Sequence, residues 1–127
     1  MKKILVIEDD RDNMDTIKLI LESDGYKVFG IEGTTDIIKS VHESQPDLVL
    51  TDYLLKGQNG LSISNALKSN LATQNIPVIL TTAHRDIAMC IDKSSFSHII
   101  IKPFDIDTIL YAVRTGLNDL NRINGKV

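Results

Sequence analysis

The sequence predicts an α/β domain built on a parallel β-sheet. Five short apolar runs alternate with amphipathic stretches along the 127 residues, and this alternation is typical of repeated strand–helix units. The runs are four or five residues long and rich in β-branched side chains, which favours strands over helices. The chain has the length of one domain with a single core, and it contains no internal repeat or low-complexity tract.

The five apolar runs are the expected strands. They span residues 3–7, 27–31, 47–51, 77–81 and 98–101. The first, third and fifth runs are nearly continuous in Val, Ile and Leu, as strands covered on both faces must be. Parallel strands need right-handed crossover connections, so we expect helices on both faces of the sheet.

Apolar residues at helical spacing predict five connecting helices. The sets that share a helix face are Met14, Ile17, Ile20 and Leu21; Ile37, Ile38 and Val41; Leu61, Ala66 and Leu67; Ile87, Cys90 and Ile91; and Ile106, Ile109, Leu110, Val113, Leu117 and Leu120. The last set is the strongest. Because Cys90 belongs to an apolar set, we expect it to be a small core residue.

Residues that favour helix ends predict several boundaries. Helix starts are indicated by the N-cap types Thr34 or Thr35, Asn59 and Asp105. Gly25 and Gly125 indicate places where a helix ends or the chain turns.

Composition excludes several classes of function. The 14 basic and 17 acidic residues give a net charge of −3, which does not suit direct binding of nucleic acid or of an anionic membrane. A single cysteine excludes an internal disulfide framework and a cysteine-based zinc site. The apolar run near the N-terminus ends at Glu8 after four residues, too short for a signal peptide or membrane helix. We therefore expect a cytoplasmic location.

Charged and polar side chains follow four of the predicted strands. Glu8 and Asp9 follow the first strand, Asp52 the third, Thr82 the fourth and Lys102 the fifth. In an open parallel sheet, ligands bind beyond the carboxyl ends of the strands, so we expect these side chains to converge on one crevice.

Crowded carboxylates repel one another unless a cation lies among them. A hard cation with oxygen ligands suits this set, and Mg²⁺ typically takes one or two carboxylates and keeps several waters. Together with the Lys102 ammonium, such a cation would attract a phosphoryl group to the crevice.

Four motifs at these strand ends resemble the receiver domain of bacterial two-component response regulators, the family of the chemotaxis protein CheY. The motifs are ILVIEDD at 4–10, DLVLTD at 47–52, IPVILTTA at 76–83 and IIKPF at 100–104. The resemblance covers nearly the whole chain. It implies a flavodoxin-like, CheY-like doubly wound fold with strand order 2-1-3-4-5 and five helices. The receiver domain would span residues 1–121, and 122–127 would form a polar tail or a truncated linker.

The resemblance also implies a metal site. Asp9 and Asp52 would bind Mg²⁺, or Mn²⁺, directly. The backbone carbonyl of Leu54 would be a further ligand, and Glu8 would act mainly through a metal-bound water.

The same resemblance implies that Asp52 is the phosphoacceptor. Its carboxylate would attack phosphorus to form an acyl phosphate. Thr82 and Lys102 would contact the phosphoryl oxygens and stabilise the product, and a cis peptide would precede Pro103.

The implied function is a phosphorylation-dependent signalling switch rather than a metabolic enzyme. The chain would take a phosphoryl group from a phosphohistidine of a sensor kinase or phosphotransfer protein, and it would catalyse its own phosphorylation and dephosphorylation. The fourth helix, fifth strand and fifth helix would form the face that binds an output partner, and phosphorylation could also drive dimerisation. The alternative is a pseudo-receiver, a protein-interaction module that acts without phosphorylation.

The sequence departs from the family pattern at several positions. Lys56 replaces a usual proline, so we expect a more mobile loop there rather than a lost site. Ile99 replaces the usual aromatic residue and cannot perform a ring flip. Phe96 replaces a usually small residue; we interpret it as a core residue, with the alternative that it forms part of the switch surface. Leu54 cannot orient an attacking water, which predicts slow self-dephosphorylation unless His84 positions water instead.

Overall fold

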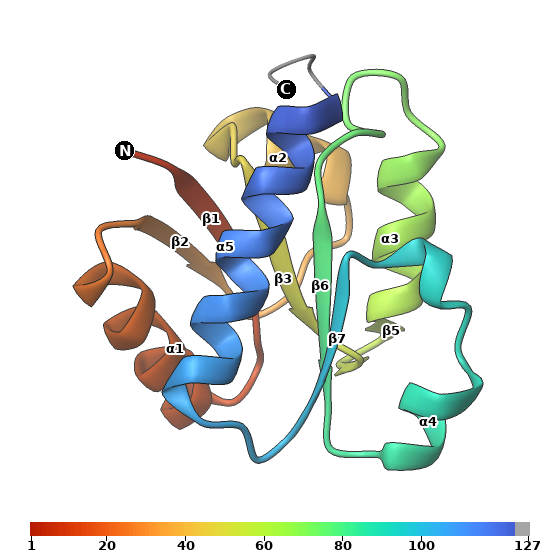
Figure 1. Cartoon of the computed structure of the whole chain (residues 1–127). Coiled ribbons are helices and arrows are strands. Elements are labelled where there is room, and N and C mark those ends of the chain that lie inside the picture. Colours follow the sequence, from red (N-terminus) through yellow and green to blue (C-terminus); the bar gives the residue numbers. More distant parts are fainter. Residues whose placement is uncertain (124–127) are drawn as a thin grey trace.

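The computed structural model describes residues 1–123 and contains a five-stranded parallel sheet. The strands are β1 (Lys3–Ile7), β2 (Lys27–Ile31), β3 (Leu48–Asp52), β6 (Val78–Thr82) and β7 (His98–Ile101). Their order across the sheet is β2-β1-β3-β6-β7, which is the predicted 2-1-3-4-5 order of the five strands (Figure 1). The sheet therefore confirms the predicted doubly wound fold.

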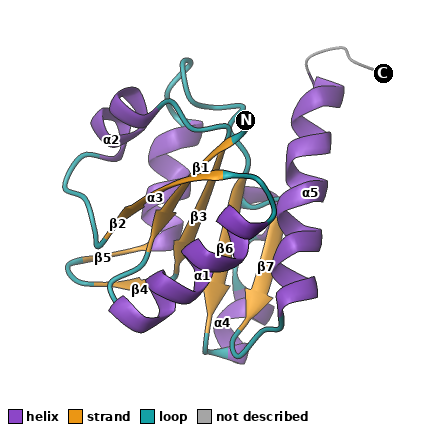
Figure 2. Ribbon diagram, turned by 90° about the vertical axis from the view of Figure 1, so that its left-hand side faces the viewer, coloured by secondary structure: helices purple, strands orange, loops and turns teal. Residues whose placement is uncertain are grey.

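Helices cover both faces of the sheet (Figure 2). They are α1 (Arg11–Ser23), α2 (Ile37–Ser44), α3 (Gly60–Lys68), α4 (Arg85–Cys90) and α5 (Ile106–Ile123), with a short 3₁₀ turn at Lys93–Ser95. One buried cluster joins the sheet to α1 and α5, and a second joins the other face to α2 and α3. Phe96 is 8% exposed and belongs to the second cluster, so its interpretation as a core residue is confirmed.

Two strands begin one residue later than predicted. Asp47 and Pro77 precede β3 and β6 instead of starting them. Pro77 has no N–H to donate to the ladder, and the Asp47 carboxylate accepts a hydrogen bond from the Lys3 backbone N–H at 2.8 Å. As a result, Asp52 and Thr82 are the last residues of β3 and β6.

Two of the predicted N-caps are confirmed and one is wrong. Asn59 and Asp105 accept hydrogen bonds from Ser62 N and Thr108 N at the starts of α3 and α5. Helix α2 is capped by Asp36, not by Thr34 or Thr35, because the Asp36 carboxylate accepts from Lys39 N. The Thr34 hydroxyl instead accepts from the Asp36 N–H in the preceding turn. Gly25 follows α1 with a φ of +94°, as its prediction as a helix end requires.

The helix faces differ from the predicted sets at three places. Cys90 is exposed, so its prediction as a core residue is wrong: α4 is only six residues long, and Ala88 is its buried residue. Ile106 is 56% exposed, at the first residue of α5. Ile63, absent from the predicted set, is the buried apolar residue of α3 together with Leu67. The predicted tail begins at residue 122, but α5 continues to Ile123. The side chain of Leu120, and residues 124–127 of the predicted tail with Gly125 among them, lie outside the described residues.

A two-stranded hairpin that the sequence did not predict follows β3. Strands β4 (Leu54–Leu55) and β5 (Gln58–Asn59) pair in antiparallel fashion around a turn at Lys56 and Gly57, whose φ is +77°. The Gln58 side-chain amide donates to the Thr34 carbonyl oxygen at 2.6 Å, which ties the hairpin to the loop before α2. The hairpin leads directly into α3, whose N-cap is the predicted Asn59.

Candidate functional site

Three carboxylates meet at the carboxyl end of the sheet. Glu8 and Asp9 directly follow β1, and Asp52 ends β3, the strand beside β1. Each offers an oxygen that lies within 4.8 Å of the other two. Glu8 is 2% exposed, whereas Asp9 and Asp52 are half-buried. The predicted convergence of these side chains is confirmed.

Lys102 joins this cluster from the far edge of the sheet. It follows β7, and its ammonium nitrogen lies 2.9 Å from Glu8 Oε1 and 3.3 Å from Asp52 Oδ2. Its backbone N–H donates to the Thr82 carbonyl oxygen at 2.8 Å, which continues the pairing of β6 with β7. The Lys102–Pro103 peptide bond is cis, as the resemblance implied.

The pKa values of both members of this ion pair are raised, but for different physical reasons. Burial raises the pKa of the Glu8 carboxyl above its usual value, although the hydrogen bond from Lys102 acts to lower it. Burial acts to lower the pKa of Lys102, but the Glu8 and Asp52 carboxylates outweigh it and raise that pKa. Lys102 is therefore a fixed positive charge in the site.

Three carboxylates and one ammonium leave two net negative charges in the cluster when all are ionised. A divalent cation would balance that charge, and carboxylate oxygens are the ligands that Mg²⁺ prefers. The donor set of Glu8, Asp9 and Asp52 therefore fits a hard divalent cation.

Thr82 and Leu54 lie on the segments that border the cluster. Thr82 ends β6, the strand beside β3, and is 1% exposed; its hydroxyl oxygen accepts from His84 N at 3.0 Å. Leu54 is the second residue after Asp52, and its side chain is 51% exposed.

Gly60 is a site residue that the sequence analysis missed. It begins α3, and its N–H donates to the Tyr53 carbonyl oxygen at 2.8 Å. A Cβ at this position would lie 2.8 Å from the Asp52 carbonyl oxygen and 2.5 Å from Leu80 Cδ1. Only glycine lets the start of α3 approach the backbone of Asp52 this closely. In the sequence, the only indication of this role was the Asn-Gly pair at 59–60, and such a pair is equally typical of an ordinary turn.

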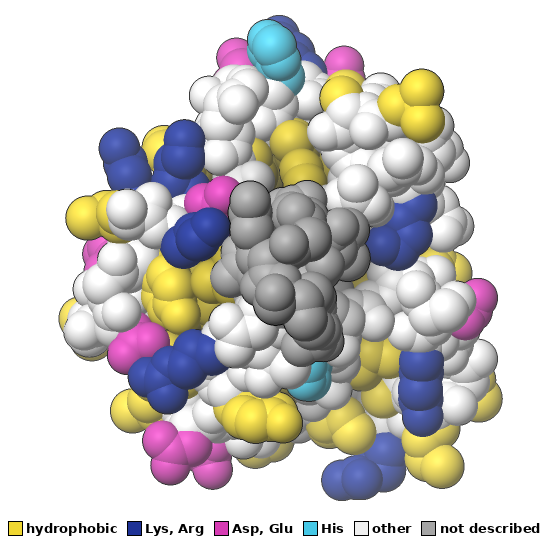
Figure 3. Space-filling view, turned by 45° about the horizontal axis from the view of Figure 1, so that its top comes forward, with side chains coloured by type: hydrophobic (Ala, Val, Ile, Leu, Met, Phe, Trp, Pro, Cys, Tyr) yellow, Lys and Arg dark blue, Asp and Glu magenta, His cyan; other side chains and the backbone are white. Residues whose placement is uncertain are grey.

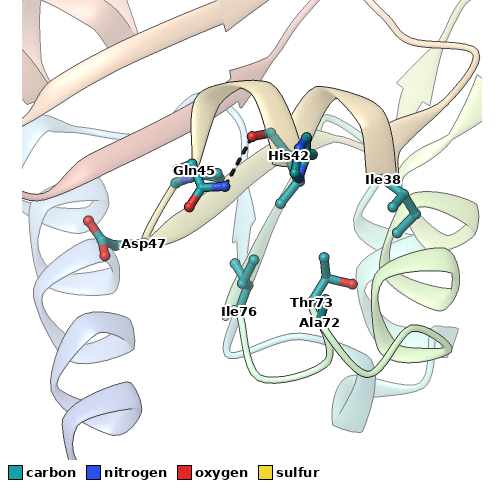
Figure 4. A pocket seen from close by; sticks show the side chains of 9 residues that line it. Ile38, His42, Gln45, Asp47, Ala72, Thr73 and Ile76 are labelled. Atoms are coloured by element: carbon teal, nitrogen blue, oxygen red, sulfur yellow. Dashed lines mark hydrogen bonds between the residues drawn. The ribbon is translucent and has the colours of Figure 1, made fainter.

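A cavity of about 340 Å³ lies at the opposite end of the sheet, where β3 begins. Figure 4 shows it between α2 and the loop from α3 to β6, with the Gln45 amide donating to the His42 carbonyl oxygen at 3.1 Å. Its wall combines aliphatic side chains such as Ile38 and Ile76 with polar ones such as His42 and Thr73. It offers no group of carboxylates comparable to the cluster at Asp52.

The surface agrees with the composition. On the face in Figure 3, Lys and Arg side chains lie in separate small groups, with Asp and Glu side chains among them, and the coloured residues form no continuous basic area. Within residues 1–123, no helix combines the length and the hydropathy needed to cross a bilayer.

Comparisons with known proteins identify the family. The model of the response regulator receiver domain matches residues 4–114. The DNA-binding response regulator MtrA of Mycolicibacterium paratuberculosis is 30% identical over 118 residues, which are 91% of this chain and 51% of MtrA. The DNA-binding dual master transcriptional regulator RpaA of Synechocystis is 33% identical over 129 residues, covering 97% of this chain and 52% of RpaA. The chain thus spans about half the length of these curated relatives.

A solved structure agrees over the full fold. The response regulator receiver domain protein of Clostridium thermocellum superposes with a TM-score of 0.84 at 27% identity, covering 97% of this chain and 99% of that one. The family match and the sheet order show that the chain belongs to the response regulator receiver domain family of two-component signalling, with the CheY-like fold.

Proposed function

We propose that this chain is a phosphorylation-controlled switch and that Asp52 is its phosphoacceptor. The observation that carries the proposal is that Asp52 lies beside two further carboxylates and the Lys102 ammonium. The two carboxylates belong to residues that follow β1, and Lys102 follows β7. An ordinary surface cluster of acids would not hold a buried Glu8 and a lysine from the sheet edge in one ion-pair network.

The donor would be a phosphohistidine on a sensor histidine kinase or a phosphotransfer protein. An Asp52 carboxylate oxygen attacks phosphorus in line, the O–P bond forms, the P–N bond breaks, and the imidazole leaves with its electron pair. Lys102, 3.3 Å from Asp52 Oδ2, stabilises the negative charge on the transferring oxygens. The Thr82 hydroxyl, at the end of the neighbouring strand, would take one phosphoryl oxygen of the product.

Asp9, Asp52 and the Leu54 carbonyl would hold Mg²⁺ or Mn²⁺ directly, and Glu8 would act through a bound water. When bound, the cation supplies charge neutralisation for the incoming phosphoryl group. The three carboxylate oxygens within 4.8 Å of one another support this assignment.

The output would be a change in partner binding. The proposed face consists of α4, β7 and α5, where Met89 is 71% and Tyr111 66% exposed. MtrA and RpaA are described as DNA-binding proteins, but the net charge of −3 does not suit direct DNA contact by this chain. We therefore expect a protein partner, or a second copy of the chain, on this face.

The domain bounds and the cellular location are part of the same proposal. We assign residues 1–121 to the receiver domain, since the family match ends at 114 and α5 continues beyond it, and 122–127 to a tail or linker whose first two residues are the last two of α5. A cytoplasmic location would place the chain beside its phosphohistidine donor.

Intact mass spectrometry tests the proposal, because the chain lacks tryptophan for a fluorescence assay. The protein is incubated with a small acyl phosphate, with and without Mg²⁺, beside Asp52→Asn as the matched variant. We expect one labile phosphoryl group on the wild type with Mg²⁺, and none on Asp52→Asn or without the metal. No modification, and no stabilisation of the fold by Mg²⁺, would favour the phosphorylation-independent module instead.

A further inference from the structure

Thr81 carries a fully buried hydroxyl group that the reaction described above does not use. The residue is 0% exposed on β6, an inner strand of the sheet between β3 and β7. Its Oγ1 has no hydrogen-bond partner among the described residues, a state it shares with one other buried side-chain atom, His98 Nδ1. A buried hydroxyl without a partner lowers stability, so its presence beside a functional site calls for a physical reason.

The sheet register places Thr81 in the same row as the acidic cluster. Asp52 pairs with Thr81, and Thr81 pairs with Ile100. Continuing the pairing of Ile7 with Thr51 by one residue brings Glu8 beside Asp52. In a parallel sheet, paired residues point to the same face, so Glu8, Asp52 and Thr81 form one row on the face covered by α1 and α5.

Lys102 must extend over this row to make its ion pairs. It lies two residues after Ile100 and therefore on the same face of the sheet. Strand β6, with Thr81, separates the strand of Lys102 from that of Asp52, at a spacing of about 4.8 Å per strand. The lysine side chain therefore reaches Asp52 and Glu8 only by crossing β6 near Thr81.

The unused groups of the two residues are complementary. An ammonium has three N–H donors, and the salt bridges to Glu8 and Asp52 occupy two of them. At least one Lys102 donor and the Thr81 acceptor are thus free on the same face of the sheet.

We propose that Thr81 is a positioning residue: its hydroxyl oxygen accepts a hydrogen bond from Lys102 when the ammonium leaves Glu8 and turns to the phosphoryl group on Asp52. Asp52 adjoins Thr81 in the row, whereas Glu8 is one strand farther away. Withdrawal of the ammonium from Glu8 therefore brings it toward Thr81. The hydroxyl is satisfied in the phosphorylated state and unsatisfied in the resting state, which biases Lys102 toward the phosphoryl group. This inference rests on the proposed function.

The test compares Thr81→Val, which keeps the shape and removes the hydroxyl, with Thr81→Ser, which keeps the hydroxyl. The phosphorylation rate with a small acyl phosphate and Mg²⁺ is followed by mass spectrometry, and stability by urea unfolding. We expect Thr81→Val to slow phosphorylation about 2- to 10-fold, the effect of one hydrogen bond, without loss of stability. Thr81→Ser should restore the rate to within about twofold of the wild type.

Thr73→Val is the matched control for loss of a buried hydroxyl. Thr73 is 5% exposed in the loop before β6, and its hydroxyl donates to the Leu67 carbonyl oxygen at 2.7 Å. We expect this variant to be less stable but phosphorylated at the wild-type rate.

A Thr81→Val variant that is phosphorylated at the wild-type rate would overturn the inference, as would a Thr81→Ser variant no faster than Thr81→Val. If the wild type itself takes up no phosphoryl group, the proposed function fails, and the inference about Thr81 falls with it. The wild-type control therefore separates the two failures.

Discussion

The ammonium nitrogen of Lys102 lies 2.9 Å from Oε1 of Glu8, although the two residues are 94 positions apart in sequence and follow strands separated by β3 and β6. The Glu8 side chain is 1% exposed and that of Lys102 is 16% exposed, so water screens the pair poorly. Burial of Glu8 is tolerable because Lys102 compensates its charge. The pair is therefore both a structural link across the sheet and the electrostatic core of the site.

Replacing Lys102 by methionine should destabilise the fold by about 1–3 kcal/mol, because it leaves the buried Glu8 carboxylate without its partner. Urea unfolding at neutral pH measures the change. Glu8→Gln in the Lys102→Met background should recover part of the loss, and Lys18→Met, at an exposed position on α1, serves as the control. Equal stability of Lys102→Met and the wild type would contradict the assigned role of the pair.

Binding of Mg²⁺ should weaken as the pH falls, at pH values where an ordinary carboxylate is still ionised. Burial raises the pKa of Glu8, so a proton competes with the cation for this side chain earlier than at an exposed glutamate. Calorimetric Mg²⁺ titrations between about pH 8 and pH 5 measure the effect. Glu8→Gln should bind Mg²⁺ more weakly, and its Mg²⁺ affinity should depend less on pH. If the affinity of this variant falls as steeply with pH as that of the wild type, the proton that competes with Mg²⁺ binds to a group other than Glu8.

The sheet was predictable because its residues obey one local rule. Each strand is a short, mainly apolar run that a polar residue ends or follows, and three of the five strands have the predicted bounds. The same rule placed Glu8, Asp52 and Lys102 at strand ends, and parallel pairing then brought them together. The sequence pattern was enough to predict these site residues, because the carboxyl ends of parallel strands lie at the same edge of the sheet.

Other features depend on contacts that no local pattern encodes. Cys90 fits an apolar set, but α4 ends at that residue and leaves it exposed. Gly60 is required by its distance to the Asp52 backbone, which exists only after α3 packs on β3. The free hydroxyl of Thr81 likewise becomes visible only when the partners of every neighbouring group are known.

Gly60→Ala should lower the free energy of unfolding by about 1–3 kcal/mol and slow phosphorylation of Asp52. The Leu80 side chain can rotate away from the new methyl group, but the Asp52 carbonyl, 2.8 Å from it, can move only with the strand that carries the phosphoacceptor. Alanine favours helices over glycine, so helix propensity alone predicts the opposite sign. Gly33→Ala is the matched control, because a Cβ there meets nothing within 4 Å. A Gly60→Ala protein that is more stable than the wild type and is phosphorylated at the same rate would contradict this prediction. It would show that β3 can shift to accommodate the methyl group without any effect on the site.

Self-dephosphorylation should be slow, and Leu54 should be the reason. Its aliphatic side chain is 51% exposed two residues after Asp52, where it can neither donate to nor accept from an attacking water. Leu54→Asn places an amide at this position and should shorten the half-life of the phosphorylated protein severalfold.

His84 is the competing candidate for positioning that water. It is exposed at the N-cap of α4, and its backbone N–H donates to the hydroxyl oxygen of Thr82, a proposed phosphoryl ligand. If its imidazole orients water, His84→Ala should lengthen the half-life. The decay of the phosphorylated mass, followed after removal of the donor, measures both variants. A half-life that neither Leu54→Asn nor His84→Ala changes would contradict the prediction, because it would mean that neither side chain affects how water reaches the acyl phosphate.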